Sequence, residues 1–247
     1  MKLAQILFCQ GFGTRRDCEG LVHGGHVRHQ GQACHDTELD LPTDGLVLQV
    51  RGQDWPFHAQ ALLMLHKPTG VECSQKPKHH PSVYTLLPGP LRHRDVQSIG
   101  RLDADTTGLL LFTDDGTLLH KLTSPKHHVP KVYEVGCKHP VTPDQVTALL
   151  KGVKLVDDPA TVAAAAAEPT GERADGLHGL RMTLVQGKYH QVKRMMAAVG
   201  NRVEQLHRSQ FGPLSLPSDL APGQWRWLDA SQIDWKAAPS ATPARAG

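Results

Sequence analysis

The stretch GRLDADTTGLLLFTDDG, from Gly100 to Gly116, decides how this chain is interpreted. Two carboxylates, Asp103 and Asp105, stand in a polar segment, and the apolar run 109–112 follows directly. Such a run predicts a buried strand, and residues with chemical roles concentrate in loops that a rigid strand holds in place. Three interpretations compete: a phosphatase nucleophile, a turn or metal cluster, and a carboxylate that acts on a nucleic-acid base.

The spacing of the two carboxylates fits the D-x-D-x-T pattern of aspartyl-phosphate phosphatases. In those enzymes the first Asp attacks phosphorus, the second acts as acid and base, and Mg²⁺ is required. Here the preceding residues, SIGRL, do not form a buried apolar strand, and no later Gly-Asp pair supplies metal ligands. Spacing alone is a weak signal, so this interpretation is not favoured. For Asp105, capping of a turn is the simplest interpretation.

Composition places the chain among globular proteins. Its 247 residues, 39% hydrophobic and 21% charged, suffice for one or two domains. The 5 cysteines are scattered without a C-x-x-C pair, which predicts reduced thiols and neither a disulfide framework nor a zinc site. No segment has the length of a membrane span or the apolar core of a secretory signal, so we expect a cytoplasmic protein.

The net charge of +3 is unevenly distributed. Residues 1–60 carry 5 Lys/Arg and 7 Asp/Glu, whereas residues 61–140 carry 10 and 7. The excess positive charge permits an anionic polymer as partner without requiring one. Adjacent histidines at 79–80 and 127–128 point to opposite faces of an extended segment, and H-E-x-x-H is absent, so no metal is expected.

The first 60 residues have the pattern of a small module followed by a linker. Apolar spacing over residues 3–7 predicts a helix, and Thr14 can cap a second helix that Gly24 ends. A turn at 30–31 joins two short strands. The polar stretch RGQDWPFHAQ, residues 51–60, predicts a linker.

The remaining chain alternates strands and helices. Strands are expected over 62–65, 131–137 and 180–187, and helices over 142–152 and 189–201. The Ala- and Gly-rich segment 157–176 is expected to form a loose excursion, and the tail 237–247 to be disordered.

The residues around Asp103 have a specific resemblance. The segment 98–135, SIGRLDADTTGLLLFTDDGTLLHKLTSPKHHVPKVYEV, resembles the catalytic core of the RsuA/RluB-type bacterial rRNA pseudouridine synthases. Their signature is G-R-L-D-x-D-[ST]-x-G-L-[LM]-[LIV]-[LMF]-[ST]-[DN]-[DN]-G. The element LHKPTG is similar to their L-N-K-P-x-G, with His66 in place of Asn, and segments 187–216 and 219–228 match their C-terminal motifs. Within the family, SPKHH and HPSV are most like the small-subunit (16S) branch.

The resemblance implies an α+β fold. A small N-terminal helix–helix–hairpin module over 1–57, similar to the S-four-type RNA-binding fold, precedes a pseudouridine synthase domain over 58–236. That domain is expected to have a mostly antiparallel mixed sheet flanked by helices. The implied activity is isomerisation of uridine in ribosomal RNA, without a cofactor, by a monomer that binds rRNA or an assembly particle. Large-subunit (23S) RNA as target, or an RNA-binding or ribosome-assembly factor that has lost catalysis, are the alternatives.

The resemblance also assigns roles to residues. Asp103 is the expected nucleophile, and Lys193 the cation that keeps it ionised, because burial disfavours the charged form of a carboxylate. Arg194 is expected at a phosphate or the pocket rim. Tyr133 is expected to stack on the target base, and Arg101 to help flip the nucleotide. Further phosphate contacts are expected at Lys131, Arg181 and Arg208.

Overall fold

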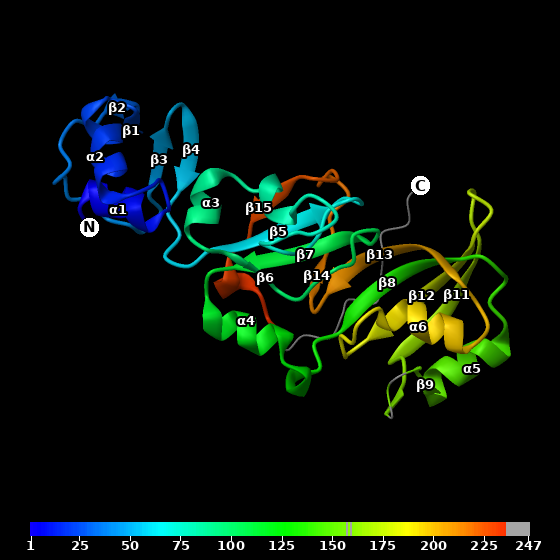
Figure 1. The fold of residues 1–247 in the computed structure, drawn as a ribbon. Helices are drawn as coiled ribbons and strands as arrows, with labels where there is room; N and C mark the ends of the chain where they lie inside the picture. Colours follow the sequence, from blue (N-terminus) through cyan, green and yellow to red (C-terminus); the bar gives the residue numbers. More distant parts are fainter. Residues whose placement is uncertain (157, 159, 236–247) are drawn as a thin grey trace.

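The computed structural model describes residues 1–156, 158 and 160–235. The chain forms a small N-terminal module at one end and a larger domain built around one sheet (Figure 1). The fold is α+β with a mixed, mostly antiparallel main sheet, which confirms the expected class. The expected disordered tail, 237–247, lies outside the described residues.

The N-terminal module packs two helices on a small antiparallel sheet. Helix α1 spans Leu3–Cys9, and α2 spans Arg15–His23. Thr14 begins α2 with a capping box, in which its side chain and that of Asp17 each accept from the other's backbone N–H. The module has its own apolar core. The sheet has the order β2-β1-β3-β4, with strands β1 Val27–His29, β2 Gln32–Ala33, β3 Val47–Val50 and β4 Gln53–Pro56.

The expected linker over 51–60 is wrong in part, because β4 lies within it and pairs with β3 along its length. The buried Trp55 lies among polar residues, so the segment lacks the apolar alternation that predicts a strand. Pro56 is tolerated because β4 is at the edge of the sheet, where one side needs no ladder hydrogen bonds.

The main sheet has nine strands, in the order β11-β12-β8-β13-β7-β5-β15, with β14 and β6 attached to β13 and β7. Neighbouring strands are antiparallel except β7 and β13. The strands are β5 Leu62–Lys67, β6 Gln97–Ser98, β7 Thr107–Thr113, β8 Lys131–Cys137, β11 Ala166–Glu172, β12 His178–Leu184, β13 Val203–Phe211, β14 Leu214–Ser215 and β15 Trp225–Trp227.

The parallel contact between β7 and β13 is a seam at the centre of the sheet. It pairs Thr107 with His207 and Gly108 with Arg208. Gly108 has a φ of +110°, and a Cβ there would lie 2.3 Å from the Arg208 carbonyl oxygen. Glycine is therefore required for the two backbones to meet, and this seam brings the loop before β7 beside β13.

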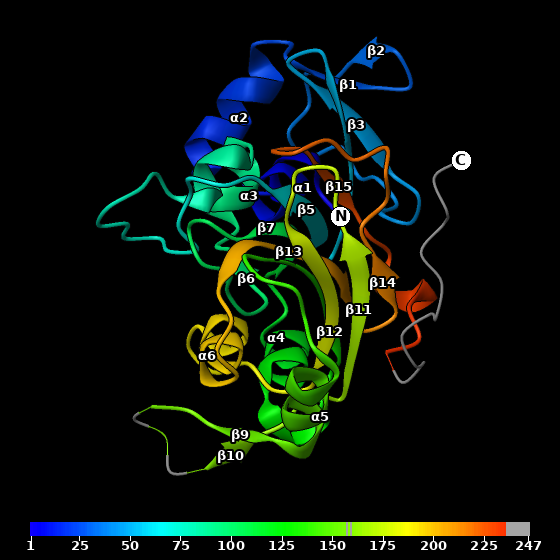
Figure 2. The same ribbon diagram turned by 90° about the vertical axis from the view of Figure 1, so that its right-hand side faces the viewer.

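The helices cover the sheet on both faces. Side chains of β5 and β7 alternate between two cores, which explains why β5 is almost continuously buried and reads as an apolar run. Helix α4 packs on one of these cores through Leu122, and α5 and α6 pack on the other through Leu149 and Met195. Figures 1 and 2 show α5 and α6 at the end of the domain remote from α2. The helices are α3 Gly89–His93, α4 Gly116–Thr123, α5 Pro143–Lys151 and α6 Gln191–Ala198, with 3-10 turns η1 Val83–Leu86, η2 Pro125–His127 and η3 Ala230–Gln232.

The expected loose excursion over 157–176 is also wrong in part. A short hairpin joins β9 Val153–Lys154 to β10 Thr161–Val162, and β11 pairs with β12. Strand β11 is an exposed edge strand with a register shift between Pro169 and Gly171, so its sequence lacks apolar alternation. Positions 157 and 159 lie outside the described residues.

A buried arginine joins the N-terminal module to the larger domain. Arg94 follows α3, and its side chain is only 4% exposed. Its Nε donates to Asp114 Oδ2 at 2.8 Å, and Nη1 donates to Gln10 Oε1 and the His58 carbonyl at 2.9 Å each. Nη2 donates to the Ala59 carbonyl at 3.2 Å. The guanidinium thereby connects α1, the connecting segment and the loop after β7.

Close backbone packing and aromatic contacts complete this junction. A Cβ at Gly11 would lie 2.0 Å from the Pro90 carbonyl oxygen, so the module sits directly against α3. Phe12 and Trp227 each make an edge contact with Trp55, at 5.2 and 5.6 Å between ring centroids. The junction is thus packed as well as hydrogen bonded.

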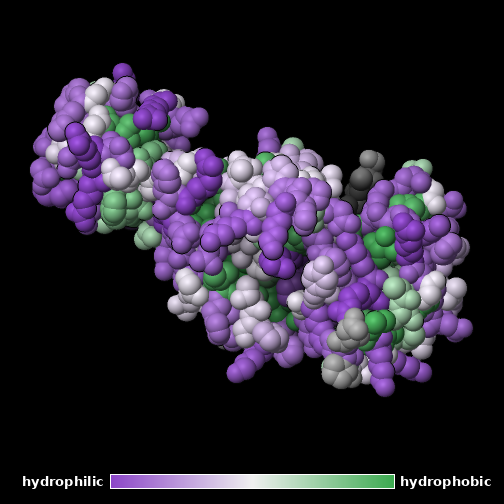
Figure 3. Space-filling model, in the orientation of Figure 1, coloured by the Kyte–Doolittle hydropathy of each residue, from purple (hydrophilic) through white to green (hydrophobic). Residues whose placement is uncertain are grey.

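No described helix is both long and apolar enough to cross a bilayer. The face drawn in Figure 3 is mostly hydrophilic, with small separate hydrophobic areas. Among the described residues, the exposed large hydrophobic side chains are scattered singly, which is ordinary for a protein surface.

Candidate active site

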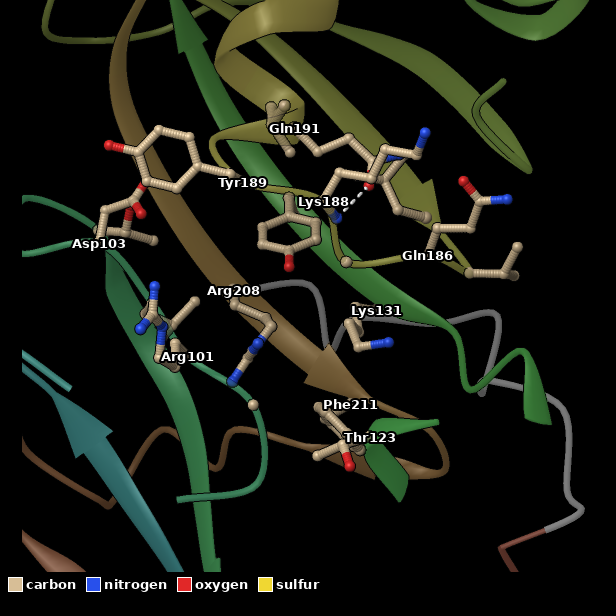
Figure 4. Close-up of a pocket in the computed structure, with 18 of the residues that line it drawn as sticks. Arg101, Asp103, Thr123, Lys131, Gln186, Lys188, Tyr189, Gln191, Arg208 and Phe211 are labelled. Atoms are coloured by element: carbon tan, nitrogen blue, oxygen red, sulfur yellow. Dashed lines mark hydrogen bonds between the residues drawn. The ribbon is translucent and has the colours of Figure 1, made fainter. Parts of the chain in front are cut away.

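One cavity of about 650 Å³ lies where the seam, the loop 100–106 and the start of α6 meet. This volume is in the usual range for small-molecule sites. Figure 4 shows Asp103, Arg101 and Tyr189 at one end, Arg208 in the middle, and Lys131, Phe211 and Gln186 at the other. The cavity therefore brings together side chains from segments about 100 residues apart.

A buried lysine fixes the loop that carries Asp103. Lys67, at the end of β5, is 0% exposed. Its ammonium donates to three carbonyls, those of Pro68 and Thr106 at 2.9 Å and that of Ala104 at 3.3 Å. Burial lowers the pKa of Lys67, while the nearby carboxylates act to raise it. The role of Lys67 was not predicted from the sequence, although the residue belongs to the LHKPTG element.

The structure brings Lys193, and not Arg194, beside Asp103. Lys193 Nζ lies 3.4 Å from Asp103 Oδ2, and the two side chains are about a quarter exposed. Arg194 points elsewhere on α6, where it donates to the carbonyls of Tyr189 and Val156. Adjacent helix residues point about 100° apart, which explains the separation.

A histidine also contacts the Asp103 carboxylate. His190 Nε2 lies 3.3 Å from Asp103 Oδ1, and the His190 ring stacks on Tyr189 at 3.8 Å. His190 precedes α6 with a φ of +48°, an uncommon conformation for a non-glycine residue. Neither aromatic residue was predicted as part of the site; their only signal in the sequence is their place immediately before QVKRM in GKYHQVKRM.

Asp105 has a partner that the turn interpretation did not foresee. The expected turn exists, because the Thr106 N–H donates to the Asp103 carbonyl at 3.1 Å. The Asp105 carboxylate, however, accepts hydrogen bonds from Lys193 Nζ at 2.7 and 2.8 Å, whereas Asp103 Oδ2 lies 3.4 Å from the same nitrogen. Partial burial acts to raise the pKa of Asp105, but the hydrogen bond and charge of Lys193 outweigh it and the pKa is lowered.

Tyr133 and two cations form the rest of the cavity wall. Tyr133, on β8, is 9% exposed and pairs across the sheet with Arg208 on β13. Arg208 is 1% exposed; its Nε donates to the Leu109 carbonyl at 2.8 Å, and its Nη2 has no hydrogen-bond partner among the described residues. Lys131 Nζ and the Arg208 guanidinium each lie 5.3 Å from the Phe211 ring centre.

Burial also affects the protonation of Lys131. Burial, with a contribution from the charge of Arg208, lowers the pKa of Lys131 to about 8. Its Nζ donates to the Val129 carbonyl at 2.9 Å. No carboxylate is among the described ion-pair partners of Lys131 or Arg208. The wall therefore presents two poorly compensated positive charges to the cavity.

The two other arginines lie in different places. Arg101 is exposed and lines the cavity near Asp103 (Figure 4). Arg181 pairs with Glu134 at 2.9 Å on the next position of the β8–β12 ladder after Tyr133. Successive strand residues point to opposite faces, so Arg181 lies across the sheet from the cavity.

The sequence that forms this site matches a known family over more than half of the chain. The family model for RNA pseudouridylate synthase matches residues 61–198, which include Asp103, Tyr133 and Lys193. The chain belongs to this family. It is therefore a pseudouridine synthase, an isomerase, and the predicted resemblance is confirmed.

Individual synthases match over nearly the full length. The ribosomal small subunit pseudouridine synthase A of Escherichia coli (strain K12) is 42% identical, over 94% of this chain and 98% of its own. That of Vibrio parahaemolyticus is 35% identical over 95% and 98%. A crystal structure described as pseudouridylate synthase aligns with a TM-score of 0.62 and 31% identity, over 94% of this chain and 97% of its own.

Proposed function

We propose that this synthase converts one specific uridine of small-subunit (16S) ribosomal RNA to pseudouridine, with Asp103 as the nucleophile. The observation that carries the proposal is a carboxylate with an adjacent ammonium at a cavity that also contains Tyr133. The choice of RNA rests on the 42% identity with small-subunit synthases over 94% of the chain.

The reaction breaks the bond between the ribose C1′ and N1 of uracil, turns the base, and joins C1′ to C5. The C5 proton then leaves and N1 gains a proton, so no electrons are exchanged with a cofactor. Asp103 can attack C1′, attack C6 of the base, or begin a glycal route by removing the C2′ proton. Each route needs an ionised carboxylate in a largely dry site, and Lys193 supplies the charge that keeps it ionised.

Tyr133 and Arg101 hold the nucleotide in this proposal. The buried Tyr133 ring lies on the cavity wall, where it can stack on an unpaired base, and its hydroxyl can carry the C5 proton. Arg101, exposed at the mouth, can take the place that the flipped uridine leaves in the RNA stack.

The remaining cations contact phosphates. Lys131 and Arg208 place two charges on the cavity wall without a carboxylate among their described ion-pair partners, and a backbone phosphate compensates them. Arg194 contacts an RNA phosphate at the rim of the cavity. Arg181 acts from the opposite face of the sheet, on RNA that continues around the domain.

The chain is proposed to act as a cytoplasmic monomer. Residues 1–57 form the RNA-binding module and residues 58–236 the catalytic domain. Because residues 1–60 carry more acidic than basic side chains, the module recognises rRNA or an assembly particle by shape more than by phosphate neutralisation.

Mapping the modified uridine tests the substrate. Purified protein is incubated without added metal with unmodified small- and large-subunit rRNA, and pseudouridine is located by carbodiimide primer extension. One stop in small-subunit RNA is expected. A stop only in large-subunit RNA keeps the chemistry and changes the target. If naked RNA gives no stop, a partly assembled small-subunit particle is used. The absence of a stop with this particle favours the alternative that the protein binds RNA without catalysis.

Asp103→Asn tests the nucleophile in the same assay. The variant keeps the size and hydrogen bonding of the side chain but loses its charge, so we expect folded protein that binds RNA and forms no pseudouridine. Lys193→Met is expected to lower kcat more than RNA affinity, and Arg194→Met to do the reverse. Equal effects in the two variants contradict these separate roles.

A further inference from the structure

The two carboxylates of the DAD segment share one ammonium unequally. Lys193 Nζ makes two contacts with Asp105, at 2.7 and 2.8 Å, within good hydrogen-bond range. Its distance to Asp103 is 3.4 Å, which is an ion pair without a short hydrogen bond. The lysine that neutralises the nucleophile therefore directs its N–H donors mainly to the neighbouring acid.

Asp105 has the position of a support and not of a reacting group. Its side chain is 69% exposed, against 27% for Asp103, and it is not among the residues that line the cavity. The loop is fixed independently, because Lys67 holds the backbone on both sides of Asp105. A change at Asp105 thus acts on Lys193 without releasing Asp103.

We propose that Asp105 is a positioning residue that holds the Lys193 ammonium beside Asp103 while keeping its hydrogens away from the nucleophilic oxygens. A carboxylate oxygen that accepts a short hydrogen bond from an ammonium has one lone pair fewer for attack. An ammonium at 3.4 Å still favours the ionised carboxylate by its charge. Asp105 separates these two effects of the same lysine.

Several other charged or titratable groups lie near this pair and are unchanged by substitution of Asp105. They are Arg101 on the same loop, His190 directly before α6 and beside Asp103, and Lys67 at the end of β5. Removal of the Asp105 charge removes a negative neighbour and frees Lys193 to approach Asp103. Both changes stabilise the charged form of Asp103.

The inference rests on the proposed function, in which Asp103 is the nucleophile. In Asp105→Asn we expect the acid limb of the kcat profile to move about one pH unit lower, because a like charge is lost and the cation moves closer. At pH 7, kcat is expected to fall roughly tenfold, since the bound lone pair attacks less well, with KM for RNA changed less than twofold. Asp105→Glu, which restores the charge, is expected to recover the wild-type profile.

A second measurement needs no turnover. The ¹³C NMR signal of the Asp103 carboxyl carbon reports the ionisation of that carboxyl group in the free protein. This ionisation should occur at lower pH in Asp105→Asn than in wild type. Asp219→Asn is the matched control, because Asp219 is 74% exposed and pairs with Arg226 at 3.1 Å, away from the cavity. Titration equal in wild type and Asp105→Asn, or a change in KM alone, overturns the inference. If Asp103 ionises at lower pH in Asp105→Asn than in wild type, but the wild type makes no pseudouridine, the proposed function is refuted instead.

Discussion

Two buried arginines in this molecule have opposite surroundings. Arg94, at the junction with the N-terminal module, uses all three guanidinium nitrogens on protein acceptors, and one of these is the Asp114 carboxylate. Arg208, in the cavity wall, makes one hydrogen bond through Nε, and its Nη2 is left without a partner in the described part of the chain. The Arg94 side chain is 4% exposed and Arg208 as a whole residue is 1% exposed, so both guanidinium groups are largely removed from water.

We propose that the difference separates a structural charge, Arg94, from a charge that binds substrate, Arg208. A buried ion contributes to a fold only when its hydrogen bonds and its charge are both compensated. Arg94 meets this condition with protein groups, whereas Arg208 lacks compensation and has Lys131 as a second positive neighbour. We therefore expect substitutions at Arg94 to reduce stability and substitutions at Arg208 to reduce activity.

The largest effect is expected at the junction. Arg94→Met leaves Asp114, whose side chain is 17% exposed, without its cation, and removal of one partner of a largely buried pair costs about 3–5 kcal/mol. Urea unfolding measures the loss. Arg92→Met, an exposed neighbour on α3, is the control and is expected to stay within about 0.5 kcal/mol of wild type. A loss below about 1 kcal/mol at Arg94 contradicts its structural role.

Arg208→Met is expected to have the reverse profile. Without the guanidinium, kcat/KM for RNA should fall about 100-fold, as when a preorganised charge is removed from an active site. The free energy of unfolding should not decrease, because an uncompensated charge has left the interior. Arg208→Lys, which keeps the charge but not the planar fork, should be intermediate in activity. A clear loss of stability in Arg208→Met would assign this arginine to the fold.

The positive charge of the cavity wall depends on pH, because Lys131 titrates with a pKa of about 8. Its ammonium is charged below its pKa of about 8, so the affinity for RNA should decline as the pH rises through that value. In Lys131→Met the affinity is expected to be about tenfold lower at pH 7, as for loss of one charge-assisted hydrogen bond, and not to change between pH 7 and 9. Filter binding at constant salt measures both. A wild-type affinity that does not change over this range contradicts the phosphate contact.

The same lysine affects stability with a definite sign. Its pKa of about 8 in the folded protein is below the ordinary value of 10.5, so the folded state binds fewer protons between these values. The cost of burying the charge is complete below pH 8 and is relieved as the pH rises to 10.5. At pH 7, Lys131→Met should therefore be more stable than wild type, by on the order of 1 kcal/mol. Thermal unfolding across this range checks the sign.

The smallest effect is expected at Arg181, whose pair with Glu134 is about one-third exposed on each side. Such pairs contribute under about 1 kcal/mol, so Arg181→Met should leave stability nearly unchanged. As a phosphate contact, it should reduce the salt dependence of RNA binding by about one unit of slope. An unchanged slope removes Arg181 from the RNA interface.

Local patterns in the sequence predicted the elements whose determinants are local. Thr14 capping α2, and Thr142 and Gly152 bounding α5, have their signals within one turn of the helix. Strand β4 was missed because its one buried side chain, Trp55, lies among polar residues. Strand β11 was missed because an exposed edge strand needs no apolar alternation.

The residues of the candidate site differ in the same way in how far they could be predicted from local sequence. The motif resemblance identified Asp103 and Lys193, which the structure places 3.4 Å apart. It did not identify the hydrogen bond from Lys193 to Asp105, whose partners are 88 positions apart in the chain, or the three backbone contacts of Lys67. No local pattern records these contacts, because they exist only after distant segments have packed.

The seam between β7 and β13 also sets the order in which this enzyme becomes active during synthesis. Thr107 and His207, which face each other across it and share a 2.9 Å hydrogen bond, are separated by 100 positions. A ribosome that has made residues 1–198 has already produced Asp103, Tyr133 and Lys193, but not Arg208 or the strand that carries it. The nascent chain therefore contains Asp103 well before the strand that completes the cavity beside it, and the cavity can form only when residues 203–211 have been made and have docked between β7 and β8.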